Sequence, residues 1–277
     1  MFNIPNLFTA SNMLCGILAI LLSVSGRIDL APFAIYLGAI LDFFDGFLAR
    51  KLNQQGELGK QMDSLADMIT FGVAPGVMIM VLLTTFNFNL GECTKMIEGY
   101  NIEPSIVDKS NYSFSSWIQS VIQLQPTSYI PFIALIIPFF SIFRLAKFNI
   151  DTRQSDSFIG LNTPANTIFF TSFPLLCFYY DGDHSFAGEL VRTIVTPSIL
   201  VPLIILMSLL LVSEIPFFSF KFKHFKWKGN ELRFLFLITC GILIPTILVW
   251  SIPIIILLYI ILSVVENLFI KNKQYEV

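Results

Sequence analysis

Residues 41–68 read LDFFDGFLARKLNQQGELGKQMDSLADM, and this stretch carries most of the information in the chain. Asp42 and Asp45 lie near the end of one apolar run, and Asp63 and Asp67 lie near the start of the next. Ionisable side chains inside apolar, membrane-length segments are costly, and they are therefore functional by default. The stretch predicts two helices joined by a short loop, with a site between them.

The spacing of the four aspartates predicts that they meet. Asp42 and Asp45 are three residues apart, and Asp63 and Asp67 are four apart, so each pair shares one helix face. An antiparallel hairpin brings both pairs together beside its loop. Four like charges repel unless a cation joins them. Oxygen ligands without His or Cys suit a hard cation such as Mg²⁺ or Mn²⁺, and four carboxylates suffice for two divalent ions.

Small residues and one arginine surround these carboxylates. Gly46, Ala49, Gly56 and Gly59 leave room for close approach of a ligand or a backbone. Arg50 stands at the expected membrane boundary, where a guanidinium can bind a phosphate through two hydrogen bonds. The set therefore favours a phosphate-containing substrate.

The flanking sequence places this hairpin in a membrane protein. Hydrophobic residues make up 55% of the 277 residues and charged residues only 13%, against about 25% charged in soluble domains. The balance of 17 basic against 19 acidic residues argues against nucleic acid as a partner. We expect an all-α, polytopic helix bundle of about eight transmembrane helices. The expected spans are 7–25, 30–51, 60–86, 128–149, 163–181, 195–213, 233–250 and 252–270.

The basic residues predict an orientation, because Lys and Arg concentrate in cytoplasmic loops. With both termini inside, the outer segments hold four of the 17 basic residues, and the inner segments hold the rest. The outer four are Arg27, Lys95, Lys109 and Arg192. The four aspartates then face the cytoplasm. Residues 87–127 become a long outer loop without recognisable chemistry.

Two further features carry less information. Residues 220–233 alternate aromatic residues with Lys, which is typical of a headgroup-level inner loop and leaves a lipid or partner site as the alternative. Cys15, Cys177 and Cys240 lie in apolar runs and Cys93 in a polar one, so no disulfide framework is expected.

The aspartates belong to a longer pattern, D-x2-D-G-x2-A-R-x8-G-x3-D-x3-D. It is filled here by Asp42, Asp45, Gly46, Ala49, Arg50, Gly59, Asp63 and Asp67. This pattern resembles the signature of the CDP-alcohol phosphotransferase family at every position. At ordinary residue frequencies a chance match arises about once in 10¹⁰ starts. The alternatives are carboxylates that merely pair with nearby Arg and Lys, and an ion-transport site; neither accounts for the spaced glycines.

The resemblance implies a six-helix core that transfers a phosphatidyl-type group from a CDP-linked lipid to an alcohol and releases CMP. It implies that Asp42, Asp45 and Asp63 bind metal, and that Asp67 is the general base and a further metal ligand. Residues that bind the CDP-lipid would come from the signature and from an early Pro-Asn-x-x-Thr element. They are Asn6, Thr9, Gly46, Ala49, Arg50, Gly56 and Gly59.

The acceptor alcohol is suggested by three other segments. Residues 143–149, 158–166 and 213–221 resemble segments of bacterial and archaeal phosphatidylserine synthases within that family, with Asn162 in place of a usual Pro. Arg144, Lys147 and Asn149 are therefore candidate serine-binding residues; the alternative is that Arg144 and Lys147 are interfacial anchors. Glycerol phosphate or inositol phosphate remains an alternative acceptor.

These features together give the remaining expectations. The partners are CDP-diacylglycerol, L-serine and membrane lipids, with a second copy of the chain as a further candidate. The location is the cell (inner) membrane, with the active site facing the cytoplasm. We expect one membrane domain, with a catalytic core over 1–217 and a basic loop plus C-terminal helical hairpin over 218–277.

Overall fold

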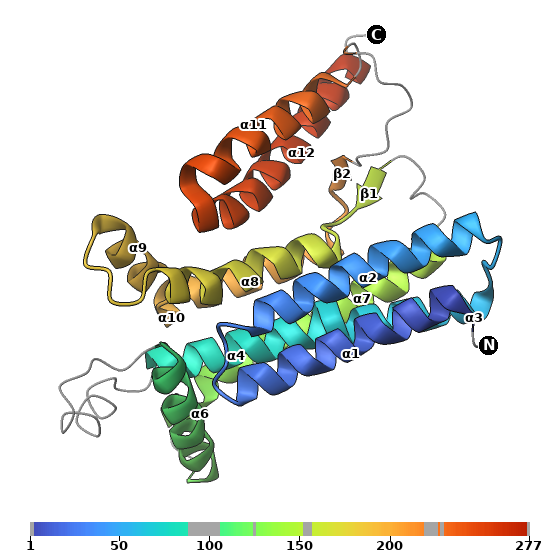
Figure 1. Ribbon diagram of the computed structural model, residues 1–277. Coiled ribbons are helices and arrows are strands. Elements are labelled where there is room, and N and C mark those ends of the chain that lie inside the picture. The colour runs from blue at the N-terminus through green and yellow to red at the C-terminus, as the bar shows by residue number, and fades with distance from the viewer. Residues whose placement is uncertain are drawn as a thin grey trace.

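The computed structural model describes residues 3–87, 106–123, 126–151, 157–218, 227 and 230–275. It is a bundle of long helices (Figure 1). In chain order the helical elements are α1 Ile4–Val24, α2 Ala31–Lys51, α3 Glu57–Asp67, η1 Met68–Val73, α4 Ala74–Asn87, α6 Ile106–Ile122, η3 Pro126–Leu135, α7 Ile136–Ile150, α8 Thr163–Tyr179, α9 Phe186–Ile194, α10 Pro197–Val212, α11 Glu231–Ile247, η4 Leu248–Trp250 and α12 Ser251–Tyr275.

The fold class expected from the sequence is confirmed, while the number of membrane spans is not. Five helical stretches of the described residues are long and apolar enough to cross a membrane, and six if the bent pair α9 and α10 counts as one span. One of the five covers both α11 and α12. Helices α8 and α10 have 17 and 16 residues, short of the roughly 20 that a bilayer core requires. The figure of eight therefore stays a prediction.

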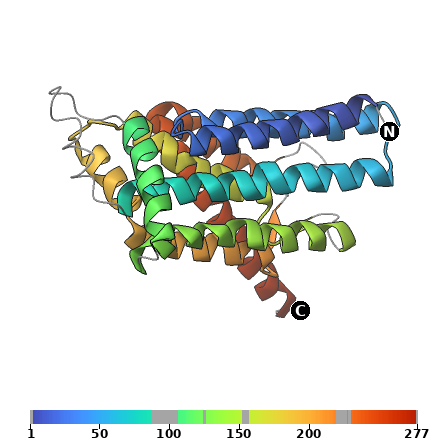
Figure 2. The same ribbon diagram turned by 90° about the horizontal axis from the view of Figure 1, so that it is seen from below.

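The site-bearing segments lie side by side in the bundle. In both views α1 and α2 run along the rod formed by α3, η1 and α4, with α7 beside it (Figures 1 and 2). Asn3 begins α1 by accepting a hydrogen bond from the backbone N–H of Asn6, with Pro5 in the first turn. The loop between α2 and α3 lies at the same end of the bundle as the N-terminus.

The junction between α3 and α4 is a π-helix, η1, that follows Asp67 directly. Gly72 of η1 faces Ser141 of α7, whose Cβ would lie 3.2 Å from a Cβ added to the glycine. Thr167 of α8 donates a hydrogen bond to the Phe71 carbonyl at 2.7 Å. The π-helix is therefore packed between α7 and α8, and this packing holds the helix that carries Asp63 and Asp67.

Two short strands were not expected. Strands β1 Ser157–Ile159 and β2 Pro216–Phe218 pair antiparallel, with Phe158 opposite Phe217. They come from two of the segments that resemble phosphatidylserine synthases. Gly160 follows β1 with a φ of +79°, and its N–H donates to the Ile215 carbonyl at 2.8 Å. The strand pair thus ties the α7–α8 connection to the end of α10.

The expected outer loop at 87–127 contains a helix, α6, that the sequence did not predict. The polar residues of this segment hide its helical pattern from a search for apolar spans. Trp117 of α6 is buried and packs against Phe132 of η3 with the rings tilted, their centroids 5.1 Å apart. Residues 88–105 of this loop lie outside the described residues.

The C-terminal residues form the expected helical hairpin. Helices α11 and α12 lie side by side (Figure 1), and the chain turns at Leu248, whose φ is +47°. The Tyr259 hydroxyl of α12 donates to the Phe218 carbonyl at 3.0 Å, which anchors the hairpin to β2. Most of the basic loop at 220–233 lies outside the described residues.

Three of the four cysteines lie within the described residues. Cys15, Cys177 and Cys240 are free thiols, two of them buried. Cys93 lies outside the described residues.

Candidate functional site

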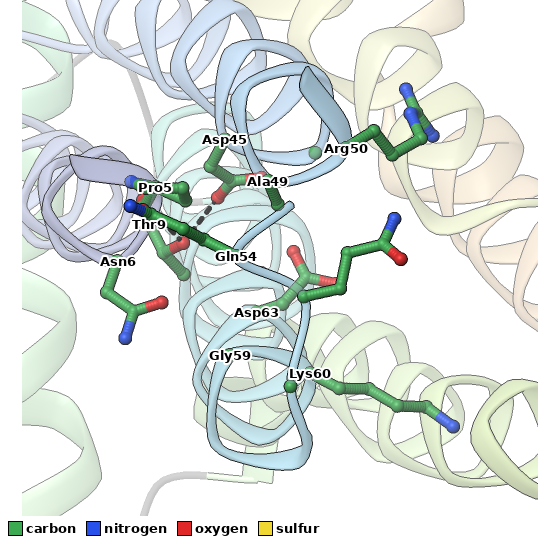
Figure 3. A pocket seen from close by; sticks show the side chains of 13 residues that line it. Pro5, Asn6, Thr9, Asp45, Ala49, Arg50, Gln54, Gly59, Lys60 and Asp63 are labelled. Carbon is green, nitrogen blue, oxygen red and sulfur yellow. Dashed lines mark hydrogen bonds between the residues drawn. The ribbon is translucent and has the colours of Figure 1, made fainter. Parts of the chain in front are cut away.

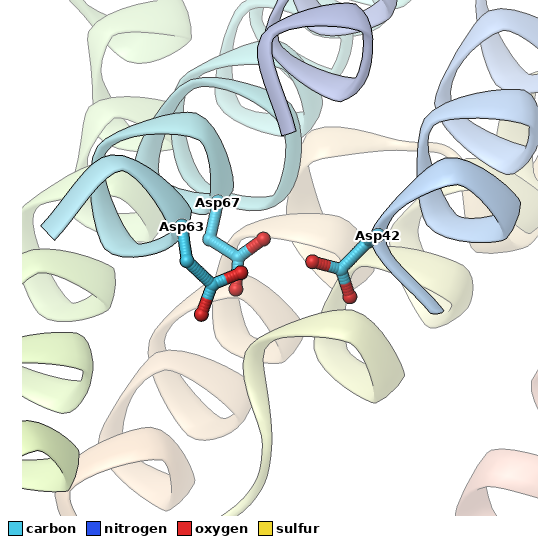
Figure 4. Close-up of side chains that lie close together, drawn as sticks. All are labelled: Asp42, Asp63 and Asp67. Carbon is cyan, nitrogen blue, oxygen red and sulfur yellow. The ribbon is translucent and has the colours of Figure 1, made fainter. Parts of the chain in front are cut away.

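Three of the four signature aspartates converge in the structure. Asp42 extends from α2 toward Asp63 and Asp67 of α3 (Figure 4). One carboxylate oxygen of each lies within 4.8 Å of one from each of the others, and all three side chains are partly exposed. Three carboxylates this close repel one another in a low-dielectric setting. An all-oxygen set of this kind fits a hard divalent cation, so the cluster could hold a metal ion.

Asp45 is not one of these three close carboxylates, but it lies near enough to interact with Asp42, Asp63 and Asp67 through its charge. It is buried, with 6% of its surface exposed, and accepts a hydrogen bond from the Thr9 hydroxyl of α1 at 2.6 Å (Figure 3). The four carboxylates therefore lie in one region, three of them as a close group and Asp45 beside them, with a hydrogen bond from α1. A carboxylate that already accepts a short hydrogen bond has its orientation fixed for a further ligand.

A cavity of about 240 Å³ opens beside Asp45 and Asp63. All seven residues expected to bind the CDP-lipid line it, and they come from α1, α2, α3 and the α2–α3 loop (Figure 3). The complete lining is Pro5, Asn6, Thr9, Asp45, Gly46, Ala49, Arg50, Gln54, Gln55, Gly56, Gly59, Lys60 and Asp63. Because Asp63 belongs to both the cavity and the three-aspartate cluster, a ligand in the cavity would contact the metal-binding group.

The glycines around the cavity have different structural roles. A Cβ added to Gly46 or Gly56 would meet no atom within 4 Å, so both positions leave open space. A Cβ on Gly59 would lie 3.3 Å from the Asn6 side-chain oxygen, which is tighter than ordinary van der Waals contact. Gly59 therefore allows α3 to approach α1, whereas Gly46 and Gly56 leave room for a ligand.

Sequence reasoning missed Gln54, Gln55 and Lys60 as lining residues. Gln54 and Gln55 fall in the eight-residue gap of the signature, where the pattern fixes no residue type. The Gln54 backbone N–H donates to the Ala49 carbonyl at 2.9 Å, which folds the loop back over the end of α2. Their place in the short loop of a helical hairpin is the signal that could have identified them.

The three candidate serine-binding residues on α7 do not line this cavity. The Arg144 side chain is 3% exposed, donates from Nε to the Leu161 carbonyl at 3.1 Å and lies 5.2 Å from the centre of the Phe148 ring. Within the described residues, its guanidinium makes no other hydrogen bond. Lys147 forms an ion pair with Glu214.

Asn149 connects α7 to α3. Its side-chain amide donates to the Ser64 hydroxyl at 2.7 Å, and its backbone carbonyl accepts from Lys60 at 2.9 Å. These bonds hold the end of α7 against the helix that bears Asp63 and Asp67. The observed role of Asn149 is therefore a contact between two helices.

Asn12 was missed entirely by the sequence analysis. Its side-chain amide donates to the Asp67 carboxylate at 3.3 Å, and the residue is fully buried on α1. It lies three residues beyond Thr9 on the same helix face, and this spacing is the signal that could have identified it.

Part of the chain matches a known protein family. Residues 2–95 match the family described as CDP-alcohol phosphatidyltransferase. The chain is 47% identical over 75 residues to a CDP-diacylglycerol–serine O-phosphatidyltransferase of Bacillus subtilis, which is 27% of this chain and 42% of the relative. It is 28% identical over 201 residues to an archaetidylserine synthase of Methanothermobacter thermautotrophicus, which is 72% of this chain and 69% of the relative.

A third relative covers a similar region. The chain is 31% identical over 186 residues to a CDP-diacylglycerol–serine O-phosphatidyltransferase of Helicobacter pylori, which is 66% of this chain and 60% of the relative. The alignments therefore span less than two-thirds of the length of two of these three relatives.

Proposed function

We propose, on the premise that residues 2–95 form a domain of the CDP-alcohol phosphatidyltransferase family, that the protein transfers the phosphatidyl group of CDP-diacylglycerol to the hydroxyl of L-serine and releases CMP. One observation carries this proposal: a cluster of three carboxylates adjoins a cavity lined by all seven residues expected to hold the CDP-lipid. The names of the relatives support serine as the acceptor.

The proposed cofactor is a divalent cation, Mg²⁺ or Mn²⁺, with two ions as the preferred stoichiometry. Asp42, Asp63 and Asp67 would hold it, with Asp45 as a further ligand beside the cavity. When bound, such ions neutralise the negative charge that builds up on a diphosphate as it is cleaved. The fit rests on the all-oxygen donor set and on the convergence of three carboxylates.

The cavity residues bind and orient the CDP-lipid. Arg50 and Lys60 supply positive charge for the diphosphate, and Gly46 and Gly56 leave open space beside it. The acyl chains remain in the bilayer, so the diphosphate lies at headgroup depth. This arrangement presents the phosphorus next to Asp63 and the other two cluster carboxylates.

Asp67 takes the proton in the transfer step. The serine hydroxyl oxygen attacks the phosphorus that carries the diacylglycerol, and its proton passes to the Asp67 carboxylate. A new phosphorus–oxygen bond forms to serine. The bond from the same phosphorus to the bridging oxygen breaks, and that oxygen leaves with CMP.

The serine carboxylate is assigned to Arg144. Its Nε is occupied by the Leu161 carbonyl, and the terminal guanidinium nitrogens make no hydrogen bond to the described residues. A planar guanidinium can bind a carboxylate through two hydrogen bonds. Lys147 is paired with Glu214, so it contributes less to this assignment than its spacing suggested.

The proposed setting is a multi-pass protein of the cell (inner) membrane with the site open to the cytoplasm. The end of the bundle that carries the cavity also carries Arg50, Lys51 and Lys60, as expected for a cytoplasmic face. Residues 1–217 are proposed as the catalytic core and 218–277 as an added loop and hairpin.

An acceptor screen on the detergent-purified protein tests this function. The protein is given CDP-diacylglycerol, Mn²⁺ and one of serine, glycerol 3-phosphate or inositol phosphate, and both CMP and the lipid product are measured. We expect CMP and phosphatidylserine with serine alone, and neither product in excess EDTA or with Asp42→Ala. Product with another acceptor would replace serine, and the absence of CMP with every acceptor would favour an ion-transport site.

A further inference from the structure

Asn12 occupies a constrained position between three segments of the bundle. The residue lies on α1 with no exposed surface, and its Nδ2 donates to Asp67 Oδ1 of α3 at 3.3 Å. Its own backbone carbonyl accepts a hydrogen bond from the Thr70 hydroxyl of η1 at 2.9 Å. Asn12 therefore contacts the last residue of α3 with its side chain and the following π-helix with its backbone.

Close packing of three segments surrounds the Asn12 side chain. A Cβ added to Gly38 of α2 would lie 2.9 Å from Asn12 Oδ1 and 2.8 Å from the Thr70 side chain. At Gly16 of α1, a Cβ would lie 2.8 Å from the Thr70 Cα. Real Cβ atoms do not approach other atoms so closely. The two glycines thus let α1, α2 and η1 meet around Asn12.

The observed orientation of the Asn12 amide leaves one of its own polar atoms without a hydrogen bond. Asn12 Oδ1 is buried and has no hydrogen-bond partner within the described residues. A buried acceptor without a partner costs about 1–3 kcal/mol. The reverse orientation would turn the amide oxygen toward the Asp67 carboxylate and replace an attractive contact with a repulsive one. The observed orientation therefore serves Asp67.

We propose that Asn12 is a positioning residue for Asp67 in the transfer reaction, an inference that rests on the proposed function. The amide N–H holds one carboxylate oxygen of Asp67 and so fixes the plane in which the carboxylate meets the acceptor hydroxyl. Asn is neutral, so it orients the carboxylate without competing for it as a cation would. A lysine at this position would neutralise the group that must accept a proton.

The position of the π-helix agrees with this role. Asp67 is the residue directly before η1, and Thr70 of η1 anchors the Asn12 backbone. Single π-turns within α-helices occur frequently at functional sites. Here the π-helix brings a hydroxyl to the Asn12 carbonyl, while the Asn12 side chain points to the carboxylate one turn earlier. The two bonds together fix α1 against the helix that carries the proposed base.

Steady-state kinetics of Asn12→Ala test the inference, with Asn12→Ser as a second variant that retains a shorter donor. We expect kcat to fall about 10- to 100-fold, as for other residues that orient a reacting group, and to recover in part with Ser. The KM for CDP-diacylglycerol should stay near the wild-type value, because Asn12 does not line the cavity. Thr167→Val is the matched control, since it removes a buried hydrogen bond to η1 that does not involve Asp67.

The double variant Asn12→Ala with Asp67→Asn shows whether Asn12 acts through Asp67 or independently of it. If Asn12 acts through Asp67, the double variant has the same kcat as Asp67→Asn alone. A further full loss in the double variant, an unchanged kcat in Asn12→Ala, or an equal loss of kcat in Thr167→Val would overturn the inference. Wild-type kcat in Asp67→Asn would instead overturn the proposed base, and with it the proposed mechanism.

Discussion

Asp67 differs from Asp63 in its surroundings, and this difference supports its assignment as the base. Asp63 also borders the cavity, whereas Asp67 lies one turn further along α3 and is held by Asn12. A carboxylate set back from the diphosphate yet close to the metal-binding group is placed to receive the proton of a second substrate. A carboxylate on the cavity wall faces the diphosphate instead.

Asp67→Asn should therefore reduce turnover to a small, measurable residual rate and leave CDP-diacylglycerol binding intact. The amide retains the shape of the side chain but cannot accept the proton, and general-base catalysis contributes about 10²–10⁴-fold. CMP release and equilibrium binding of the CDP-lipid are the measurements. If the variant keeps more than about a tenth of the wild-type rate, Asp67 is not the base.

Arg144→Lys should raise the KM for serine strongly and leave the KM for CDP-diacylglycerol nearly unchanged. Lysine keeps the charge but loses the planar pair of donors that fits a carboxylate. Arg144→Ala should cost more, about 2–5 kcal/mol if the ion pair with serine is desolvated. Both KM values are measured for each variant.

Two results would change this assignment. Equal loss of affinity for both substrates would make Arg144 a phosphate-binding or structural residue, as its bond to the Leu161 carbonyl would allow. Unchanged KM values would make it an anchor at the membrane boundary.

At the residue scale, the sequence predicted the site residues that belong to the fixed spacing of the signature and missed the site residues outside it. The signature gave the three clustered aspartates and the residues of the cavity wall, because i, i+3 and i, i+4 spacings report a shared helix face. The hydrogen bond that Asp45 accepts from Thr9 could not be predicted, because the two residues lie on different helices, 36 positions apart. Asn12 was missed because its contact with Asp67 spans 55 positions.

At the scale of elements, the connection between α7 and α8 depends on one glycine. A Cβ added to Gly160 would lie 2.5 Å from the Leu211 carbonyl oxygen, and the residue has a positive φ. Gly160 lets β1 approach the end of α10 closely enough for the backbone bonds between them. Those bonds also place Leu161, whose carbonyl holds Arg144.

Gly160→Ala should lower the thermal stability of the detergent-purified protein, and Gly182→Ala is its matched control. Gly182 has a φ of +71° but meets no atom within 4 Å of an added Cβ. Both variants carry the backbone strain, while Gly160→Ala adds overpacking that costs about 1–3 kcal/mol. We expect the larger decrease in Tm for Gly160→Ala; equal decreases would show that the close approach to α10 does not matter.

The elements themselves were predictable to different degrees. Long apolar runs predicted α1, α2, the α3–α4 rod, α7 and the C-terminal hairpin. A membrane-spanning helix can be predicted in this way because its length and hydropathy are sufficient to identify it. Helix α6 mixes Asp108 and Lys109 with apolar residues, so a search for apolar runs passes over it. The strands β1 and β2 have three residues each, too few for an alternating pattern to be recognised.

At the scale of the whole molecule, the ends of the helices that carry chemistry gather on one side of the bundle. The start of α1, the α2–α3 loop and the end of α7 lie toward the end of the bundle that holds the N-terminus in Figure 1, and the α8–α9 turn lies at the opposite end. The end of α2 and the start of α3 also carry the basic residues Arg50, Lys51 and Lys60. The orientation expected from the charge count predicts that this end faces the cytoplasm.

Cysteine labelling of sealed membrane vesicles should show that the cavity end faces the cytoplasm. Glu57 at the start of α3 and His184 in the α8–α9 turn are both exposed and lie at opposite ends of the bundle. In a background that lacks Cys93 and Cys240, an impermeant maleimide should label Glu57→Cys from the cytoplasmic face alone and His184→Cys from the opposite face alone. Cys15 and Cys177 are buried, so they should stay unlabelled in both. The reverse pattern would place the carboxylate cluster outside, away from a cytoplasmic supply of CDP-lipid and serine, and would contradict the orientation drawn from the basic residues.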